Sequence, residues 1–439
     1  MRICHFTNTF LPHVGGVARA VQTLLEDQRK ARHHVLVVAP EFDEGTAPRR
    51  VERHVERISA ITHFNKSDFS VRLPFAAALS RRLADFRTDI IHAHHPFLLG
   101  DTALREAASR QVPILFTHHT LYENYTHYLP LESEAAGDFA SEIATRFANR
   151  CDAVVAPSQS VRELIVSRGV TVPVHVIPTG IDTRKIAAGK AARARKRWDI
   201  PANVPVIGHL GRLAPEKNLG FLSRAIAKAL DALPEARALI VGDGPSRDDM
   251  VAIFKEAGVA KRVIFTGKLT GNRLHDAYAA MTQFAFSSTS ETQGLVLAEA
   301  MAAGNPVIAL DASGVREVVQ DRHNGRLLPA DTTPATFARA LVNLAKKNEL
   351  RDRWSRAAVE TAATFDRKHT TGLLLTLYKK LIFERRHRER DDEHANPIAH
   401  ALRPVVDRVA IEGGIIADKT GALLDCLAGE ASPTEHRTA

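Results

Sequence analysis

Cysteine is scarce in this sequence, and the few cysteines are scattered. The 439 residues include only Cys4, Cys151 and Cys426, an odd count without the C-x-x-C spacing of a zinc ribbon, which argues against a disulfide framework or a zinc site. The sequence also lacks any run of about 18 apolar residues. Its opening, MRICHFTNTFLPHVGG, has neither a charged leader before an apolar stretch nor a small-residue cleavage site. These absences predict a cytoplasmic protein that spans no membrane.

The apolar and basic residues that are present narrow the class further. With 45% hydrophobic residues the chain can fill two cores, and its length predicts two domains of roughly 200 residues each. The net charge of +9 favours acidic partners, such as nucleotide phosphates or anionic lipid headgroups. Because the basic residues are spread along the chain, with no basic arm and no aromatic-basic platform, the pattern argues against nucleic acid as a partner.

Short apolar, β-branched runs alternate with longer helical patterns along the chain. In the first half these runs are RICHF, HVLVVAP, DIIHAHH, VPILFTHH, CDAVVAP and VHVIP; in the second half they are PVIGHLG, RALIVGDG, RVIFTGK, QFAFSS, PVIALD and GRLLP. Continuous apolar strands are typical of a parallel sheet that is covered on both faces. The sequence therefore predicts an α/β fold with two Rossmann-like, doubly wound domains, each with its ligand crevice at the carboxyl ends of the strands.

Turn residues and charge divide the chain into segments. The turn PTGID at 178–182 and the basic stretch KAARARKRW after it indicate the connection between the domains. We expect an N-terminal domain over 1–182, a C-terminal domain over 183–365, and a helix over 366–384 that can cross back to the N-terminal domain. The remaining residues, 385–439, begin with the charged run ERRHRERDDEH, which predicts a solvated helix face or a frayed extension of unknown role.

A glycine pair marks the first junction between a strand and a helix. Gly15 and Gly16 precede a helix predicted to start near Val17, where backbone N–H groups at the helix end can hold a phosphate. The junction lacks the G-x-G-x-x-G dinucleotide fingerprint, so a plain turn is an equally good explanation of the pair.

Two basic residues follow the first strand of the second half. In GRLAPEKN, residues 211–218, Arg212 and Lys217 lie just past the end of a buried strand. Cations at this place can neutralise the charge that builds on a departing diphosphate, a task that a metal ion performs in other enzymes. No Asp-x-Asp pair occurs in the chain to hold such a metal. The alternative interpretation is a pair of solvated surface charges.

The segment SETQGLVLAEAMAAGNPVIA, residues 290–309, carries the most specific pattern. Glu291 lies in a loop before a helix predicted to begin near Gly294, and Glu299 lies inside that otherwise apolar helix. A carboxylate in a buried helix needs partners, which can be two ribose hydroxyls or a neighbouring arginine. The loop N–H groups at the helix start should face a phosphate; they belong to Thr292, Gln293, Gly294 and Leu295.

Polar and aromatic residues gather after two strands of the first half: His92, His94, His95, His118, His119, Tyr122 and Tyr125. Because strand ends face the crevice, these side chains should line one side of the site. His92 and His94 share one face of a strand and can also ligate a metal, although no cysteine or carboxylate spacing completes such a site. Hydrogen-bonded core histidines are the other alternative.

Taken together, these motifs resemble those of the retaining group 1 glycosyltransferases of the GT-B fold. The Gly-Gly turn, G-R-L-x-x-E-K, V-G-D-G-P and the Glu-x7-Glu pair occur here in the same order over most of the chain. The resemblance implies that Glu291 holds sugar hydroxyls, that Glu299 holds the ribose, and that Arg212 and Lys217 hold the diphosphate, in a cleft between two facing domains. It also implies that His119, which precedes a threonine, approaches the donor sugar from the acceptor-side domain.

A narrower resemblance concerns FTHHTLYENYTHYL and SETQGL, which are similar to segments of the bacterial diacylglycerol glucosyltransferases. It implies transfer of glucose from UDP-glucose to diacylglycerol by an enzyme bound peripherally to the inner face of the cell membrane. Because Arg212 and Lys217 can take the diphosphate charge and no Asp-x-Asp pair is present, we expect this transfer to need no cofactor and no metal. Such enzymes bind the bilayer through basic and apolar patches. The amphipathic segment 71–87, with Arg81 and Arg82, can form one, and an ordinary surface helix is the alternative.

Two other hypotheses remain open. The chain can transfer a hexose or mannose to another glycolipid, a polysaccharide precursor or a small polyol, because Glu291 can hold the hydroxyls of several hexoses. It can also be a nucleotide-sugar-binding protein without turnover, although every charged position of the motif is present.

Overall fold

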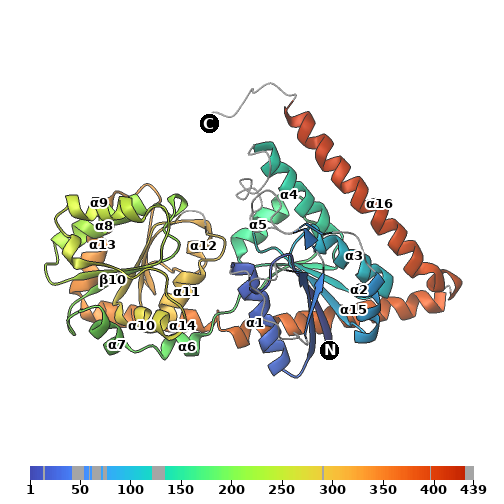
Figure 1. Ribbon diagram of the computed structural model, residues 1–439, viewed down its shortest axis with the longest axis horizontal. Helices are drawn as coiled ribbons and strands as arrows, with labels where there is room; N and C mark the ends of the chain where they lie inside the picture. Colours follow the sequence, from blue (N-terminus) through green and yellow to red (C-terminus); the bar gives the residue numbers. More distant parts are fainter. Residues whose placement is uncertain are drawn as a thin grey trace. The chain divides into compact units, whose positions relative to one another are not determined.

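The chain forms two compact units, which we call unit 1 and unit 2 (Figure 1). The computed structural model describes residues 1–12, 15–41, 54–58, 60–61, 71–72, 77–120, 134–288, 291–395 and 397–430. Unit 1 contains Met1–Ile177 together with Thr371–Ala439, and unit 2 contains Pro178–Thr370. The chain therefore leaves unit 1 before the PTGID turn, and it returns to unit 1 within helix α15 (Arg367–Ala395).

Unit 1 is built on a seven-stranded sheet in the order β3-β2-β1-β6-β7-β8-β9, with parallel pairing throughout. Its strands are β1 (Arg2–Phe6), β2 (His34–Pro40), β3 (Val55–Ile58), β6 (Ile90–Ala93), β7 (Ile114–Thr117), β8 (Ala153–Ala156) and β9 (Val174–Val176). Two short strands, β4 (Ala60–Ile61) and β5 (Val71–Arg72), form a separate antiparallel pair. All six apolar runs of the first half are strands, whereas the polar edge strand β3 was not predicted.

Unit 2 contains a six-stranded parallel sheet in the order β12-β11-β10-β13-β14-β15. Its strands are β10 (Val206–Leu210), β11 (Arg237–Val241), β12 (Val263–Phe265), β13 (Gln283–Phe286), β14 (Val307–Leu310) and β15 (Gly325–Leu328). Each coincides with one predicted run. This strand order is that of the doubly wound dinucleotide-binding fold, so the predicted fold class is confirmed.

Helices cover both faces of the unit 1 sheet. They are α1 (Gly16–Lys30), α2 (Ala77–Phe86), α3 (Leu99–Arg110), α4 (Glu134–Asn149), α5 (Gln159–Ser167), α15 and α16 (Pro397–Glu430). On one face Ile3, Ile90 and Leu115 pack against the α15 residues Leu377 and Tyr378. The opposite face of the strands packs against α3 and α4. Alternate residues of each strand thus enter different cores, which explains the continuous apolar runs.

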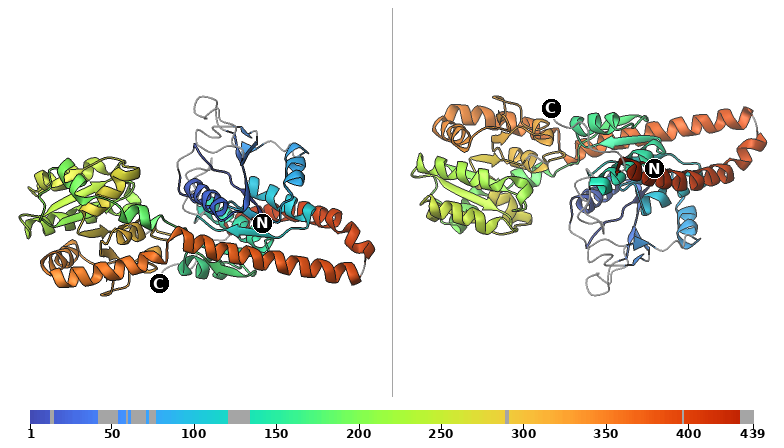
Figure 2. Two further views of the ribbon diagram at one scale, coloured as in Figure 1. Left: turned by 90° about the horizontal axis from the view of Figure 1, so that it is seen from below. Right: turned by 90° about the horizontal axis from the view of Figure 1, so that it is seen from above.

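Unit 2 repeats this arrangement with its own helices and two short 3-10 turns. These elements are α6 (Thr183–Ala187), α7 (Ala191–Arg197), η3 (Pro215–Lys217), α8 (Leu219–Asp231), α9 (Arg247–Glu256), η4 (Ala260–Arg262), α10 (Gly271–Ala280), α11 (Leu295–Ala302), α12 (Ser313–Arg316), α13 (Pro334–Lys346) and α14 (Asn348–Ala363). One core contains residues of α8, α9 and α13, and the other contains residues of α10, α11 and α14. Figure 2 shows each unit from two further sides, with its sheet between layers of helices.

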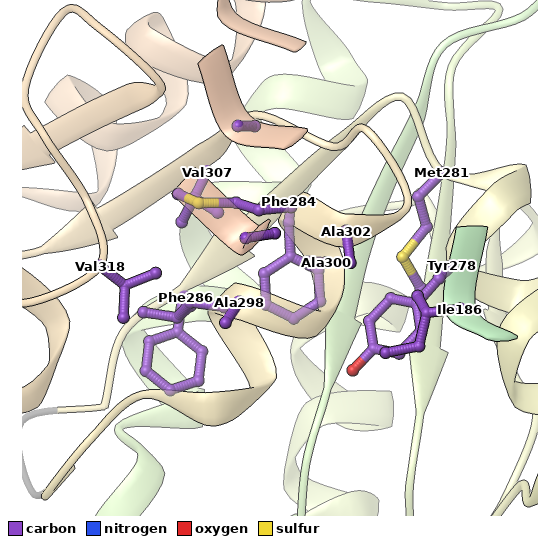
Figure 3. Packing of buried hydrophobic residues seen from close by; sticks show 14 of the residues in the cluster. Ile186, Tyr278, Met281, Phe284, Phe286, Ala298, Ala300, Ala302, Val307 and Val318 are labelled. Carbon is purple, nitrogen blue, oxygen red and sulfur yellow. The ribbon is translucent and has the colours of Figure 1, made fainter. Parts of the chain in front are cut away.

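Helix α11 is apolar because it lies inside unit 2. Leu297, Ala298 and Ala300 are fully buried against the sheet. Figure 3 shows Ala298 and Ala300 among the aromatic rings of Phe284 and Phe286 from β13. The small alanine side chains let the helix approach the strands closely, so α11 is held as a rigid element behind the loop that carries Glu291.

The strand orders place a reversal of winding between β1 and β6 in unit 1 and between β10 and β13 in unit 2. At such a switch point the connections leave in opposite directions, and a crevice opens outside the carboxyl ends of the two strands. The candidate residues His94 and His95 follow β6, Arg212 and Lys217 follow β10, and Glu291 follows β13. The predicted residues therefore lie next to the two switch points.

The residues beyond 384 differ from the predicted tail. Residues 385–395 continue α15, and α16 packs against α3 and α4 of unit 1. Ile415 and Ala422 of α16 are buried, and Glu412 accepts from the Arg105 guanidinium at 2.6 Å. Since the apolar residues of α16 that face unit 1 are spaced among charges and glycines, the sequence pattern was too weak to predict this packing. The charged run itself lies on an exposed helix surface, as one of the two alternatives proposed.

The segment 71–87 does not form one continuous amphipathic helix. Residues 71–72 are strand β5, and α2 begins at Ala77. Leu79 and Leu83 of α2 are buried in the unit 1 core, so its apolar side is not available to a bilayer. Arg81 and Arg82 are exposed, and Arg82 lies 3.6 Å from the Glu56 carboxylate. The geometry of α2 is that of an ordinary surface helix. Among the described residues, no helix is long and apolar enough to cross a membrane.

Two neighbouring isoleucines of α16 offer a matched test of its docking. Ile415 is 5% exposed and Ile416 is 65% exposed. We expect Ile415→Ala to destabilise the docked helix by about 2 to 5 kcal/mol, the usual cost of truncating a buried aliphatic side chain. Ile416→Ala should change its stability by less than about 0.5 kcal/mol. Hydrogen exchange of the α16 amides measures both, and equal effects of the two substitutions would show that α16 does not dock through Ile415.

Candidate active site

Two loops of unit 2 pack together beyond β10 and β11, and glycines make this possible. Gly242 and Gly244 have φ values of +133° and +154°. A Cβ atom on Gly242 would lie 1.8 Å from the carbonyl oxygen of Gly211, and one on Gly244 would lie 2.4 Å from that of Leu213. No side chain fits at either place, so the V-G-D-G-P loop supports the backbone that presents Arg212.

Lys217 and Glu291 form an ion pair in unit 2. The Lys217 Nζ atom donates to Oε1 of Glu291 at 2.7 Å, and the two side chains are 22% and 19% exposed. The hydroxyl of Ser287 donates to the carbonyl oxygens of Lys217 and Asn218 at 2.9 and 3.1 Å, which ties this turn to the end of β13. A partly buried charge without a counter-ion carries a desolvation cost, and the ion pair offsets this cost for both side chains. A ligand with hydroxyl and phosphate groups can replace the ion pair in this role.

Arg212 lies beside this pair in sequence but is exposed. Its guanidinium makes no hydrogen bond or ion pair with any other residue that the structure describes. The structure thus brings together two of the four predicted charged residues, Lys217 and Glu291, and leaves Arg212 available to an anion. It does not support the alternative in which Lys217 is a merely solvated surface charge.

The loop before α11 is held in place by a second glycine contact. Gly294 caps the helix with φ +65°, and its Cβ position is 2.7 Å from the Gly314 carbonyl oxygen. The Gly314 N–H donates to the Glu291 carbonyl oxygen at 2.9 Å. Gln293 is buried, and its amide donates to the Thr179 carbonyl oxygen at 3.4 Å. The helix begins at Leu295, so the backbone of 292–295 lies at the helix start, as predicted.

Glu299 has a partner that the sequence analysis did not foresee. The hydroxyl of Tyr278, on α10, donates to Oε2 of Glu299 at 2.7 Å. Tyr278 is fully buried, and burial together with the Glu299 charge raises the pKa of the Tyr278 hydroxyl well above its usual value. This hydroxyl therefore stays protonated and fixes one carboxylate oxygen of a half-buried glutamate.

A cluster of histidines in unit 1 comprises His5 on β1, His92 on β6, His94 just after β6 and the half-buried His119 after β7. His5 Nδ1 and His94 Nε2 are 2.9 Å apart, and His94 Nδ1 and His119 Nε2 are also 2.9 Å apart. His92 contacts the Tyr378 hydroxyl through Nδ1 at 2.6 Å and the Thr117 hydroxyl through Nε2 at 2.7 Å. The sequence analysis missed His5, although a histidine inside the apolar run RICHF was the available signal.

Desolvation keeps these histidines neutral. Burial lowers the pKa of His5 to about 4 and that of His119 to about 3, and it lowers the pKa values of His92 and His94 well below the usual range. His95 is also buried, and its Nδ1 accepts from the backbone N–H of Asn8 at 3.1 Å. At neutral pH each imidazole in the cluster has one donor and one acceptor nitrogen.

His5, His92 and His94 are also close enough to bind one metal ion, since their ligand atoms lie within 4.8 Å of one another. However, both ring nitrogens of each of the three histidines already have a hydrogen-bond partner in the protein. A metal would have to displace several of these bonds in a fully buried place. The geometry therefore favours hydrogen-bonded core histidines over the metal-site alternative for His92 and His94.

The structure describes some of the other predicted residues of unit 1 and not others. Gly15 caps α1 without a side-chain hydrogen bond, and the Cβ position of Gly16 is open, so a ligand can approach this helix start closely. His118 is buried at the end of β7. Tyr122 and Tyr125 lie outside the described residues.

His209 is a buried polar residue close to the candidate site in the fold, and the sequence analysis did not single it out. It is buried at the end of β10, and its Nδ1 lies 3.1 Å from the Ala285 carbonyl oxygen, which makes Nδ1 the donor. Burial and the Lys217 charge lower the pKa of His209 to about 4, although the bond to Ala285 opposes this. Nε2 is then an acceptor without a hydrogen-bond partner in the described part of the chain. The only sequence signal was a histidine within an apolar strand.

Comparisons with known proteins identify the class to which this fold and site belong. Residues 14–185 match the family described as Glycosyltransferase Family 4, and residues 191–361 match Glycosyl transferases group 1. The chain is 31% identical over 338 residues to the alpha-monoglucosyldiacylglycerol synthase of Streptococcus pneumoniae, covering 74% of this chain and 75% of that protein. The chain therefore belongs to the group 1 glycosyltransferases and is a hexosyltransferase.

Other relatives are named for different activities. The chain is 32% identical over 337 residues to a GDP-mannose-dependent alpha-mannosyltransferase of Mycobacterium tuberculosis, covering 75% of this chain and 84% of that protein. Its structure is similar to that of the Anabaena protein HepE in complex with UDP, with a TM-score of 0.67, 22% identity, and coverage of 87% of this chain and 100% of the other. This likeness shows that the fold is GT-B.

The contacts of Glu299 lead to a test of its role. We expect Glu299→Ala to weaken UDP binding by roughly 1.5 to 3 kcal/mol, the contribution of hydrogen bonds to a charged group. Tyr278→Phe keeps the carboxylate but removes one of its donors, and its loss should be smaller. Calorimetry measures both affinities. If folded Glu299→Ala protein binds UDP as well as the unchanged chain does, Glu299 has a purely structural role.

Proposed function

We propose that the chain transfers glucose from UDP-glucose to diacylglycerol at a membrane surface, with retention of the anomeric configuration. The observation that carries this proposal is the Lys217–Glu291 ion pair at the switch point of unit 2, where the exposed Arg212 also follows β10. These groups have the charges needed for a sugar diphosphate. The relative from Streptococcus pneumoniae, named an alpha-monoglucosyldiacylglycerol synthase, supports the choice of sugar and acceptor.

On this proposal, donor binding separates the ion pair. Lys217 and Arg212 bind the diphosphate, Glu291 accepts hydrogen bonds from sugar hydroxyls, and Glu299 accepts from the ribose. His119 contacts the sugar from the acceptor side, and Gly15 and Gly16 allow the donor to approach α1. Since the cations match the negative charge of the leaving group, they lower the barrier without requiring a metal ion.

The reaction balances without a covalent enzyme intermediate. The acceptor hydroxyl oxygen forms a bond to the anomeric carbon on the face that the diphosphate leaves, and the bond from that carbon to the phosphate oxygen breaks. The hydroxyl proton passes to the leaving diphosphate oxygen. The products are an α-glycoside and UDP, and Lys217 and Arg212 stabilise the charge that grows on the UDP.

A second candidate is transfer of mannose from GDP-mannose. The similarity to the mannosyltransferase of Mycobacterium tuberculosis favours it, and that similarity covers as much of the chain as the first one does. Glucose and mannose differ in the configuration of one hydroxyl, so Glu291 can accept hydrogen bonds from the hydroxyls of either sugar. Other lipid, polysaccharide or polyol acceptors remain compatible with the same donor site.

The membrane part of the proposal rests on α16 in place of α2. Leu402, Val405, Val406, Val409 and Ile416 are each more than half exposed and recur at spacings that share one side of a helix. We call this surface the α16 apolar face. The carboxylates Asp407, Glu412 and Asp418 contact Gln111, Arg105 and Arg150 of unit 1, so they do not lie on that face. An apolar strip without carboxylates suits the interface of a bilayer that contains anionic lipid.

Product analysis tests the reaction. With diacylglycerol vesicles, we expect UDP-glucose to give a lipid whose proton NMR spectrum shows an α-glucoside, and we expect turnover to persist in excess chelator. A preference for GDP-mannose would favour the second candidate. A β-linked product would contradict retention, and loss of activity in chelator with rescue by manganese would contradict the metal-independent mechanism.

Vesicle sedimentation tests the membrane contact. We expect Val409→Glu to lower binding to vesicles of phosphatidylglycerol and phosphatidylcholine by about tenfold, because a charge enters the exposed apolar strip that would insert into the bilayer. Val359→Glu, at a valine of unit 2 that is 48% exposed, is the matched control and should leave binding unchanged. Neutralising Arg81 and Arg82 separately tests α2. If Val409→Glu instead dissociates a dimer and leaves vesicle binding intact, the α16 apolar face binds a second copy of the chain.

A further inference from the structure

The buried histidines of unit 1 form a hydrogen-bonded chain with a defined start. His5 Nε2 lies 2.8 Å from Oε1 of Gln28, on α1. From His5 the contacts continue through His94 to His119, each at 2.9 Å. The His5 and His94 rings are inclined by 26° with centroids 5.2 Å apart, as are the His94 and His119 rings, so consecutive imidazoles have nearly parallel planes and meet edge to edge through their nitrogens. This arrangement allows each N–H to point at the next ring nitrogen.

The orientation of the Gln28 amide determines which nitrogens carry protons. Nε2 of Gln28 donates to the Tyr378 hydroxyl oxygen at 3.4 Å, and Tyr378 in turn contacts His92 Nδ1 at 2.6 Å. The amide oxygen of Gln28 is therefore the atom that faces His5. An amide oxygen only accepts, so His5 Nε2 must carry the proton and His5 Nδ1 must be an acceptor.

The tautomer of each histidine then determines that of the next, because each of these histidines is neutral and has one donor nitrogen. His94 donates through Nε2 to His5, and its Nδ1 accepts. His119 then donates through Nε2 to His94, which leaves a lone pair on His119 Nδ1. This nitrogen has no hydrogen-bond partner among the residues that the structure describes.

We propose that Gln28, through His5 and His94, fixes His119 in the tautomer that presents an acceptor nitrogen, and that this nitrogen accepts a hydrogen bond from a hydroxyl of the donor sugar. The second half of this inference rests on the proposed function. Gln28, His5 and His94 are positioning residues, since they act on the sugar only through His119. A tautomer fixed before binding avoids the cost of moving protons through three rings when the sugar arrives.

The fixed tautomer also selects among ligands. An acceptor at this place favours a sugar that offers a hydroxyl, and it disfavours one with an acceptor group, such as a carboxylate, at the same position. The other branch of the cluster, from Tyr378 through His92 to Thr117, is internally satisfied and does not lead to His119. It therefore provides a control with the same burial and the same kinds of group.

The test compares Gln28→Leu with Thr117→Val in the full-length chain. Nitrogen NMR of protein with labelled histidines reports which ring nitrogen of His119 carries the proton. The His119 signals are identified as those that disappear from the spectrum of His119→Gln. We expect a protonated Nε2 in the unchanged chain and in Thr117→Val, and a mixture of tautomers in Gln28→Leu. For sugar transfer, we expect Gln28→Leu to lower kcat/KM by roughly three- to tenfold, the effect of weakening one hydrogen bond. Thr117→Val should retain kcat/KM.

Each outcome bears on the proposal. A proton on Nδ1 of His119 in the unchanged chain, or an unaltered tautomer in folded Gln28→Leu, would overturn it. Thermal unfolding of both variants shows whether they are folded. If Gln28→Leu does not fold, His94→Phe interrupts the same series of hydrogen bonds at its middle, and His92→Phe then serves as the control. Because the NMR measurement needs no donor or acceptor, a chain that fails to transfer glucose can still confirm the fixed tautomer.

Discussion

Burial on both faces is the constraint on which the two sheets depend. Helices pack against each side of every central strand, so a polar side chain within a strand must find its partner inside the protein. The charged residues Arg212, Lys217 and Glu291 accordingly lie outside the strands, in the segments that follow β10 and β13. The location of the chemistry follows from the burial of the sheet, and the glycine contacts that support these loops keep the charged groups in fixed positions.

The same constraint explains how well the fold could be predicted. Twelve continuous apolar runs were recognisable because both sides of each strand enter a core, and all twelve are strands in the structure. β3 escaped prediction because it is an edge strand of half-buried residues, VERI, where charges are tolerated. The docking of α16 could not be predicted from the sequence for a related reason. It relies on ion pairs and on glycines beneath arginines, such as Gly414 under Arg150, which leave little apolar periodicity.

Site residues were easier to predict than their contacts. The motifs named Lys217, Glu291 and Glu299, but no motif shows that Lys217 contacts Glu291 or that Tyr278 contacts Glu299, because these contacts join residues far apart in sequence. The histidine cluster depends on strand register. His5 lies opposite His92 in the pairing of β1 with β6, and a shift by one residue would move His5 to the other face of the sheet. Tyr122 and Tyr125 remain predictions.

The discontinuous composition of unit 1 affects how the protein is made. The strands of its sheet are all synthesised within the first 177 residues, whereas the α15 residues that cover one face follow only after residue 370. A nascent chain therefore carries Ile3, Ile90 and Leu115 without their cover while the whole of unit 2 is translated. Unit 2 is contiguous and can fold as soon as it emerges. Unit 1, whose strands are synthesised before unit 2, is thus completed after unit 2, and one face of its sheet is open to aggregation during that interval.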